Sequence, residues 1–170
     1  MNWYKISTNI ISEEDLNKKL KCWIKHNPYM LQLFRDAQVD IDEIDDSLRF
    51  EIKELKGEFA KADSDVIALN KKLFENECFF EDHLHFVAHE ITHWLHRRAE
   101  DEWYFNDTEE FRGFAGAIGW EIFSGKDKKS IYEKFFSIIL KHFKNKDSAK
   151  KFLDSIYNRA LKYLIKNDLI

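Results

Sequence analysis

The stretch from His89 to His93 reads His-Glu-Ile-Thr-His and combines three side chains that can do chemistry together. Residues four apart on an α-helix lie about one turn on and roughly 40° round, so His89 and His93 can hold one metal ion. Glu90 projects about 100° away and can act beside the ion without being a ligand. This pattern predicts a zinc site at which Glu90 is the general base on a water molecule.

The residues around this motif indicate that it lies on a helix. Apolar residues of the segment 81–98 recur at three- and four-residue steps, as in an amphipathic helix: Leu84, Val87, Ala88, Ile91, Trp94 and Leu95. We expect Glu81 and Asp82 to open the helix and Arg97 and Arg98 to close it, because this order complements the helix dipole.

Three further histidines, His83, His85 and His96, lie close to the motif in the sequence. His85 and His96 fall near the same helical face as the two predicted ligands. Taken singly, we interpret each of the three as a hydrogen-bonded core or surface residue.

A catalytic zinc site needs a third protein ligand and keeps its fourth position for water. A second helix, expected over 109–123, offers Glu110 and, less favourably, Glu109 or Glu121; a histidine is the remaining choice. Glu110 shares its helical face with small and apolar residues, so we expect it to point inward. The alternative interpretation is that Glu109 and Glu110 only stabilise the helix dipole from the first turn and bind no metal.

Three glycines lie inside this second helix, at positions 113, 116 and 119. Each costs roughly 1 kcal/mol relative to alanine in a helix interior. We therefore expect another helix to approach them closely.

The remaining periodicities predict an α+β fold that is mostly helical. A capping pattern at Ser12 and the proline at Pro28 begin two N-terminal helices. Alternating and apolar runs predict short strands near 48–52, 58–61 and 66–69, which we interpret as an antiparallel meander packed on the motif helix. Two apolar stripes predict a pair of C-terminal helices.

These elements are expected to form one domain over 1–170. Its parts are N-terminal helices with an acidic connection (1–46), the sheet with the zinc-site helices (47–125) and the C-terminal helical pair (126–170). No 18-residue apolar run and no N-terminal leader pattern are present, which predicts a cytoplasmic protein without a membrane partner. Two cysteines far apart give no disulfide framework.

Charge is distributed unevenly along the chain. The net charge is −4, but residues 126–170 carry +7 and residues 1–125 carry −11. The lysines of the C-terminal part alternate with its apolar stripes, as on an ordinary solvated face. No nucleic-acid recognition motif accompanies them, so we do not expect a nucleic-acid partner.

The motif on its helix, a short sheet before it and a helix with an early glutamate after it resemble the gluzincin branch of zinc metallopeptidases. The resemblance is to the minimal, single-domain bacterial and phage members and spans roughly 48–123. The segment 107–115 is loosely similar to their E-x-x-A helix. The residues after His93, Trp94-Leu95-His96-Arg97-Arg98-Ala99, lack the glycine and third histidine of metzincins.

This resemblance implies a zinc cofactor, a peptide or protein substrate and a catalytic Glu90. It implies His89, His93 and a glutamate of the next helix as ligands, and an edge strand such as 65–70 that aligns the peptide by backbone pairing. Gluzincins often stabilise the oxyanion with a tyrosine or histidine from outside the motif, and the available residues are Tyr104, Tyr132, His142 and Tyr157.

The sequence therefore predicts a zinc-dependent peptidase, and two other classes stay open. One is a non-catalytic zinc-binding structural or interaction protein on the same fold, such as a phage or mobile-element component. The other is a metal-free helical binding module. A metal site closed to water would distinguish the first, and absence of metal would indicate the second.

Overall fold

The computed structural model describes residues 12–75, 77–99 and 109–170, except for the side chains of residues 77, 78 and 109. The described elements follow in the order α1 (Glu13–His26), α2 (Pro28–Asp36), α3 (Glu43–Ser47), β1 (Arg49–Lys53), β2 (Ala60–Asp63), β3 (Val66–Asn70), η1 (Lys71–Phe74), α4 (Glu77–Asp82), α5 (Leu84–His96), α6 (Glu109–Phe123), α7 (Lys128–Leu140) and α8 (Lys146–Lys166). The predicted α+β, mostly helical fold is confirmed.

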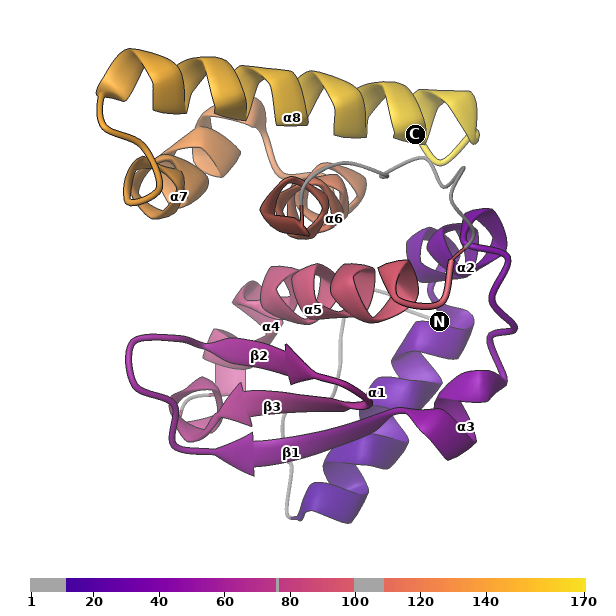
Figure 1. The fold of residues 1–170 in the computed structure, drawn as a ribbon. Coiled ribbons are helices and arrows are strands. Elements are labelled where there is room, and N and C mark those ends of the chain that lie inside the picture. Colours follow the sequence, from indigo (N-terminus) through magenta and orange to yellow (C-terminus); the bar gives the residue numbers. More distant parts are fainter. Residues whose placement is uncertain (1–11, 76, 100–108) are drawn as a thin grey trace.

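The elements are stacked in layers, with the motif helix in the middle. Figure 1 shows the sheet on one side of α5, α6 on the other side of it, and α8 as the outermost helix. The helix α1 packs against β1, and α2 packs against both α1 and α5. One cluster of buried apolar side chains extends from α1 to α8. Helix α5 is therefore covered on both faces.

The N-terminal helices begin where their capping residues predict. The side chain of Ser12 accepts a hydrogen bond from the backbone N–H of Asp15, and Asn27 caps α2 in the same way through the N–H groups of Tyr29 and Met30. Pro28 occupies the first position of α2, where its missing N–H costs nothing.

The sheet is mixed, and the predicted antiparallel meander is wrong. Its strand order is β1-β3-β2, with β1 parallel and β2 antiparallel to β3. The strand at 66–70 is therefore central, and β2 is an edge strand. The reason is the connection 54–59, which passes beyond β3 instead of making a tight turn.

Asn70, at the end of β3, holds that connection in place. It is 2% exposed, and its side-chain amide donates to the carbonyl oxygens of Leu55 (2.7 Å) and Glu58 (2.8 Å). Its side-chain oxygen also accepts from the N–H of Lys72, at the start of η1. A buried amide thus satisfies carbonyl groups that have no strand partner.

The motif helix begins at Leu84, three residues later than expected. Glu81 and Asp82 belong to α4, and His83 separates the two helices with a non-helical backbone. The His83 ring stacks on Phe79 with centroids 3.9 Å apart, and its Nδ1 lies 2.6 Å from the Phe79 carbonyl oxygen. These contacts end α4 and start a new helix, so the acidic pair does not cap α5.

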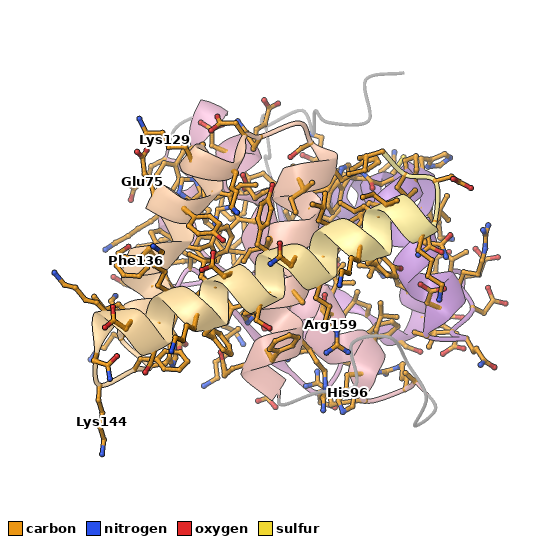
Figure 2. All side chains as sticks on the ribbon, turned by 90° about the horizontal axis from the view of Figure 1, so that it is seen from above. Glu75, His96, Lys129, Phe136, Lys144 and Arg159 are labelled. Atoms are coloured by element: carbon orange, nitrogen blue, oxygen red, sulfur yellow. The ribbon has the colours of Figure 1, made fainter. Side chains whose placement is uncertain are left out.

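The predicted C-terminal helical pair is confirmed as α7 and α8. Helix α7 buries Ile131, Phe135 and Ile139, and α8 crosses both α6 and α7 on the outer side of the molecule (Figure 2). The Arg159 guanidinium, labelled in Figure 2, lies 5.2 Å from the ring centroid of Phe111 on α6. Among the described helices, none has the length and apolar character needed to cross a membrane.

Candidate active site

The imidazoles of His89 and His93 converge on one point. Their Nε2 atoms lie 3.0 Å apart, with ring centroids at 4.7 Å. Two nitrogens that bind one zinc ion tetrahedrally, at about 2.0–2.1 Å each, lie about 3.3 Å apart. The spacing of four residues on α5 thus brings the two donor atoms to within a few tenths of an ångström of that separation.

Gly113 of α6 makes this convergence possible. A Cβ atom at this position would lie 2.4 Å from Nε2 of His89 and 2.7 Å from Nε2 of His93. No side chain fits there. Gly116 and Gly119 likewise leave room for Thr92 on α5 and Tyr29 on α2. The expected close approach of another helix is therefore confirmed.

Burial keeps the His89 imidazole neutral. It lowers the pKa of His89 to about 3, with a further contribution from the neighbouring His93. A neutral imidazole has a free lone pair on one nitrogen, which is the form that binds metals. His89 therefore needs no deprotonation at neutral pH before it can act as a ligand.

Glu90 is held against the edge of the sheet. Its carboxylate oxygen Oε2 accepts a 2.7 Å hydrogen bond from the N–H of Ala62 in β2, and the residue is 9% exposed. Burial raises the pKa of Glu90 to about 7, although the Ala62 hydrogen bond opposes this shift. Nearby Glu110 and Glu58 raise it further. A carboxyl group with this pKa is suited to exchanging protons near neutral pH.

These residues form the floor of a cavity of about 460 Å³. One wall comes from β2 and the segment before it, and the opposite wall from α6, α7 and the residues after α7. Its lining residues are Gly57, Glu58, Phe59, Ala60, Lys61, Ala62, His85, Phe86, His89, Glu90, His93, Glu110, Phe114, Ala117, Phe135, Ile138, Lys141 and His142. The volume is in the usual range for small-molecule and cofactor sites, about 300–1,000 Å³.

Two of the candidates for the third zinc ligand, Glu110 and Glu109, lie in the first turn of α6. Glu110 lines the cavity, one helical turn before Gly113, but it is solvent-exposed, contrary to the expected inward orientation. Its place in the first turn of α6 puts it at the cavity rim. The side chain of Glu109 lies outside the described part of the chain. Within that part, no three His, Cys, Asp or Glu side chains gather closely enough to hold a metal ion.

Glu121 has other partners. Its Oε1 atom lies 2.9 Å from Nδ1 of His85 and 2.8 Å from Nζ of Lys134. Its carboxylate is therefore engaged with these two residues and not with His89 and His93. The sequence signal for this contact was weak, because it joins residues of α5, α6 and α7.

Of the residues considered for the oxyanion, His142 lines the cavity. Its ring packs edge-on against Phe114, which in turn packs edge-on against His89. Tyr132 and Tyr157 are not among the lining residues; they pack on one another, and the Tyr132 hydroxyl donates to Asp154. Tyr104 lies outside the described residues.

The strand beside the site is β2, not the expected 65–70 segment. The Ala62 N–H points away from β3, toward Glu90, and strand alternation places the backbone groups of Ala60 on the same outward edge. Sequence reasoning missed both alanines because they contribute backbone atoms.

Comparisons of the chain with protein-family models, curated proteins and solved structures returned no match.

Proposed function

We propose that this protein is a zinc metallopeptidase in which His89 and His93 hold the ion and Glu90 is the general base. The proposal depends above all on the 3.0 Å approach of the two Nε2 atoms on the floor of a cavity shared with Glu90. When bound, zinc would lower the pKa of a water molecule and polarise a peptide carbonyl group.

The carboxylate of Glu90 takes the proton from the attacking water and passes it to the leaving nitrogen. Ala62 engages only one of its two oxygens, so the other is available for the transferred proton. Its pKa of about 7 supports both steps, because the group can accept and release a proton at the same pH.

A glutamate of α6 completes the ligand set in this proposal. Glu110 is the first choice because it lines the cavity beside His89 and His93 and acts electrostatically on Glu90. Glu109 is the second, and Glu121 is disfavoured by its contacts with His85 and Lys134. His142 is the proposed hydrogen-bond donor for the oxyanion, since it lines the same cavity.

The substrate is an extended peptide that pairs with β2. The N–H and C=O groups of Ala60 and the C=O group of Ala62 face the cavity side of this edge strand, and each can bond to a peptide backbone. Such pairing would lay the peptide across the floor where Glu90 and the two histidines lie. A cytoplasmic location and the absence of a nucleic-acid partner stay predictions.

The test combines metal analysis with hydrolysis of a peptide mixture. We expect about one zinc per chain in the wild type and cleavage of unstructured peptides. Glu90→Gln should keep the zinc and lose at least about 100-fold in turnover, in line with the usual worth of a general base. Glu133→Gln, the same change at an exposed position on α7, is the matched control and should cleave normally.

Two results would reject the peptidase. Retained hydrolysis in the Glu90→Gln variant would exclude Glu90 as the general base. Zinc bound without any hydrolysis would indicate the non-catalytic zinc-binding protein. One observation favours a third reading, the metal-free binding module: the described residues supply only two converging ligands. A wild-type protein that neither contains zinc nor takes it up would establish that reading.

A further inference from the structure

A second polar cluster lies beside the candidate zinc ligands. Its members are His85 on α5, Glu121 on α6 and Lys134 on α7. Glu121 Oε1 lies 2.9 Å from His85 Nδ1 and 2.8 Å from Lys134 Nζ. His85 is 1% exposed and Glu121 2% exposed, yet the His85 ring lines the cavity one helical turn before His89.

The carboxylate of Glu121 fixes which nitrogen of His85 carries the proton. Burial raises the pKa of Glu121, but His85 and Lys134 outweigh that effect, and the net result is a pKa below the usual value. An ionised carboxylate carries no proton, so the Nδ1 atom 2.9 Å from it is the ring nitrogen that holds the hydrogen. Burial also lowers the pKa of His85 to about 4, which keeps the ring neutral. Nε2 is therefore a hydrogen-bond acceptor.

This acceptor has no hydrogen-bond partner among the described residues. Aromatic side chains surround it: the His85 ring centroid lies 4.3 Å from that of Phe86 and 5.3 Å from that of Phe135. Phe59 and Ile138 continue the same apolar lining. The part of the cavity beside His85 thus has a mostly apolar lining, with Nε2 of His85 as a hydrogen-bond acceptor.

We propose that this space is a subsite for a tyrosine side chain of the substrate, with the phenol hydroxyl donating to Nε2 of His85. An aromatic ring with a polar tip matches the apolar side chains beside His85 together with the acceptor on its ring. His85 then determines specificity. Glu121 positions it through the contact with Nδ1, and Lys134 holds the Glu121 carboxylate. The inference rests on the proposed peptidase function, because the tyrosine belongs to the peptide that is cleaved.

Phenylalanine is the sharpest comparison. It would fill the same apolar space but would displace water from Nε2 without offering a hydrogen bond in return. A buried acceptor left unpaired in this way weakens binding, so the site should prefer tyrosine over phenylalanine roughly tenfold.

The first experiment measures binding and does not depend on turnover. N-acetyl-tyrosine amide and N-acetyl-phenylalanine amide are titrated into the full-length, zinc-treated protein and followed by NMR. We expect the tyrosine probe to bind roughly tenfold more tightly. Equal affinities, or no saturable binding of either probe, would overturn the proposal.

His85→Phe removes the acceptor and keeps an aromatic ring. The ratio of the two affinities should then fall to about one, mainly through weaker binding of the tyrosine probe. Ile138→Ala is the matched control, because it removes an apolar wall: both probes should weaken and their ratio should persist. A ratio unchanged by His85→Phe would exclude His85 as the acceptor.

Replacing His85 leaves the buried Glu121 carboxylate with one partner fewer, which costs folding free energy. The double variant His85→Phe/Glu121→Gln removes that charge and answers the same question. The ratio of the affinities for the tyrosine and phenylalanine probes, measured in the wild type, tests the proposal without any substitution.

Cleavage of paired peptides separates this inference from the peptidase proposal. Two peptides differ only in tyrosine or phenylalanine beside the cleaved bond. Cleavage of both at equal kcat/KM would overturn the tyrosine subsite and leave the peptidase standing. Tyrosine-selective binding without cleavage of either peptide would support recognition by His85 and reject the peptidase.

Discussion

Gly113 lies directly against His89: a Cβ atom at position 113 would be 2.4 Å from Nε2 of that imidazole. Atoms at this distance overlap, so any larger residue must displace the ring or the helix α6. The same Cβ would lie 2.7 Å from Nε2 of His93. The absence of one side chain on α6 thus keeps both candidate ligand atoms accessible.

Gly113→Ala should therefore weaken zinc binding by at least about tenfold, because the two rings can no longer converge beside the added methyl group. Zinc affinity of the folded variant, measured by competition with a chelating dye, checks this. Gly116→Ala is the matched control: its Cβ would collide with the Thr92 hydroxyl and not with an imidazole. Similar affinity losses in the two variants would contradict a specific role for Gly113.

His93→Ala should abolish stoichiometric zinc binding, since one imidazole cannot replace the pair. His26→Ala is the control, because His26 is an exposed histidine on α1 that bonds to the Cys22 carbonyl oxygen. It should retain the wild-type zinc content. Elemental analysis of the purified variants measures both. Full zinc occupancy in His93→Ala would place the metal elsewhere.

Glu110→Gln and Glu109→Gln address the third ligand. We expect Glu110→Gln to lower zinc affinity at least about tenfold, because a carboxylate ligand is replaced by a neutral amide. Glu109→Gln should change it little. The reverse result would assign the ligand to Glu109, and equal, small effects in both would remove α6 as its source.

Glu90 should make the stability of the metal-free protein depend on pH. Its folded-state pKa of about 7 is above the ordinary value of 4.5, so the native state holds a proton that the unfolded state releases. The stabilisation is present below pH 4.5 and is lost as pH rises to about 7. Relative to Glu90→Gln, the wild type should lose at most about 3 kcal/mol of unfolding free energy across this range.

Urea denaturation at several pH values, with a chelator present, measures that difference. Glu133→Gln, a change at an exposed carboxylate of α7, controls for the loss of a surface charge. A pH-independent difference between the wild type and Glu90→Gln would contradict the buried state of Glu90.

Asn70→Ala should destabilise the fold by about 1–3 kcal/mol, because it removes the buried amide that donates to the carbonyl groups of Leu55 and Glu58. Asn158→Ala, on the exposed face of α8, is the control and should change stability by less than about 0.5 kcal/mol. Chemical denaturation measures both. An unaffected Asn70→Ala protein would mean that other contacts hold the connection 54–59.

Local features of the sequence were enough to predict the longer helices and the pairing of the two histidines, but not the short helices α3, η1 and α4. Four-residue spacing places His89 and His93 on one face of a helix regardless of what packs around it. Ser12, Asn27 and Pro28 mark helix starts through bonds within a few residues of themselves. The glycines of α6 indicated a close helix contact because nothing else justifies their cost.

The arrangement of the strands and the partners of the polar groups required the tertiary structure. Strand order depends on where the connection 54–59 passes, and the hydrogen bond that Asn70 makes to it joins residues 15 positions apart in the sequence. Likewise, the hydrogen bond from Ala62 to Glu90 and the contact of Glu121 with His85 join residues from separate elements. Periodicity within one element shows which face is buried. It does not show which element packs against that face. The packing of α5 against β2 and α6 places Glu90 at the sheet edge and Glu121 beside His85.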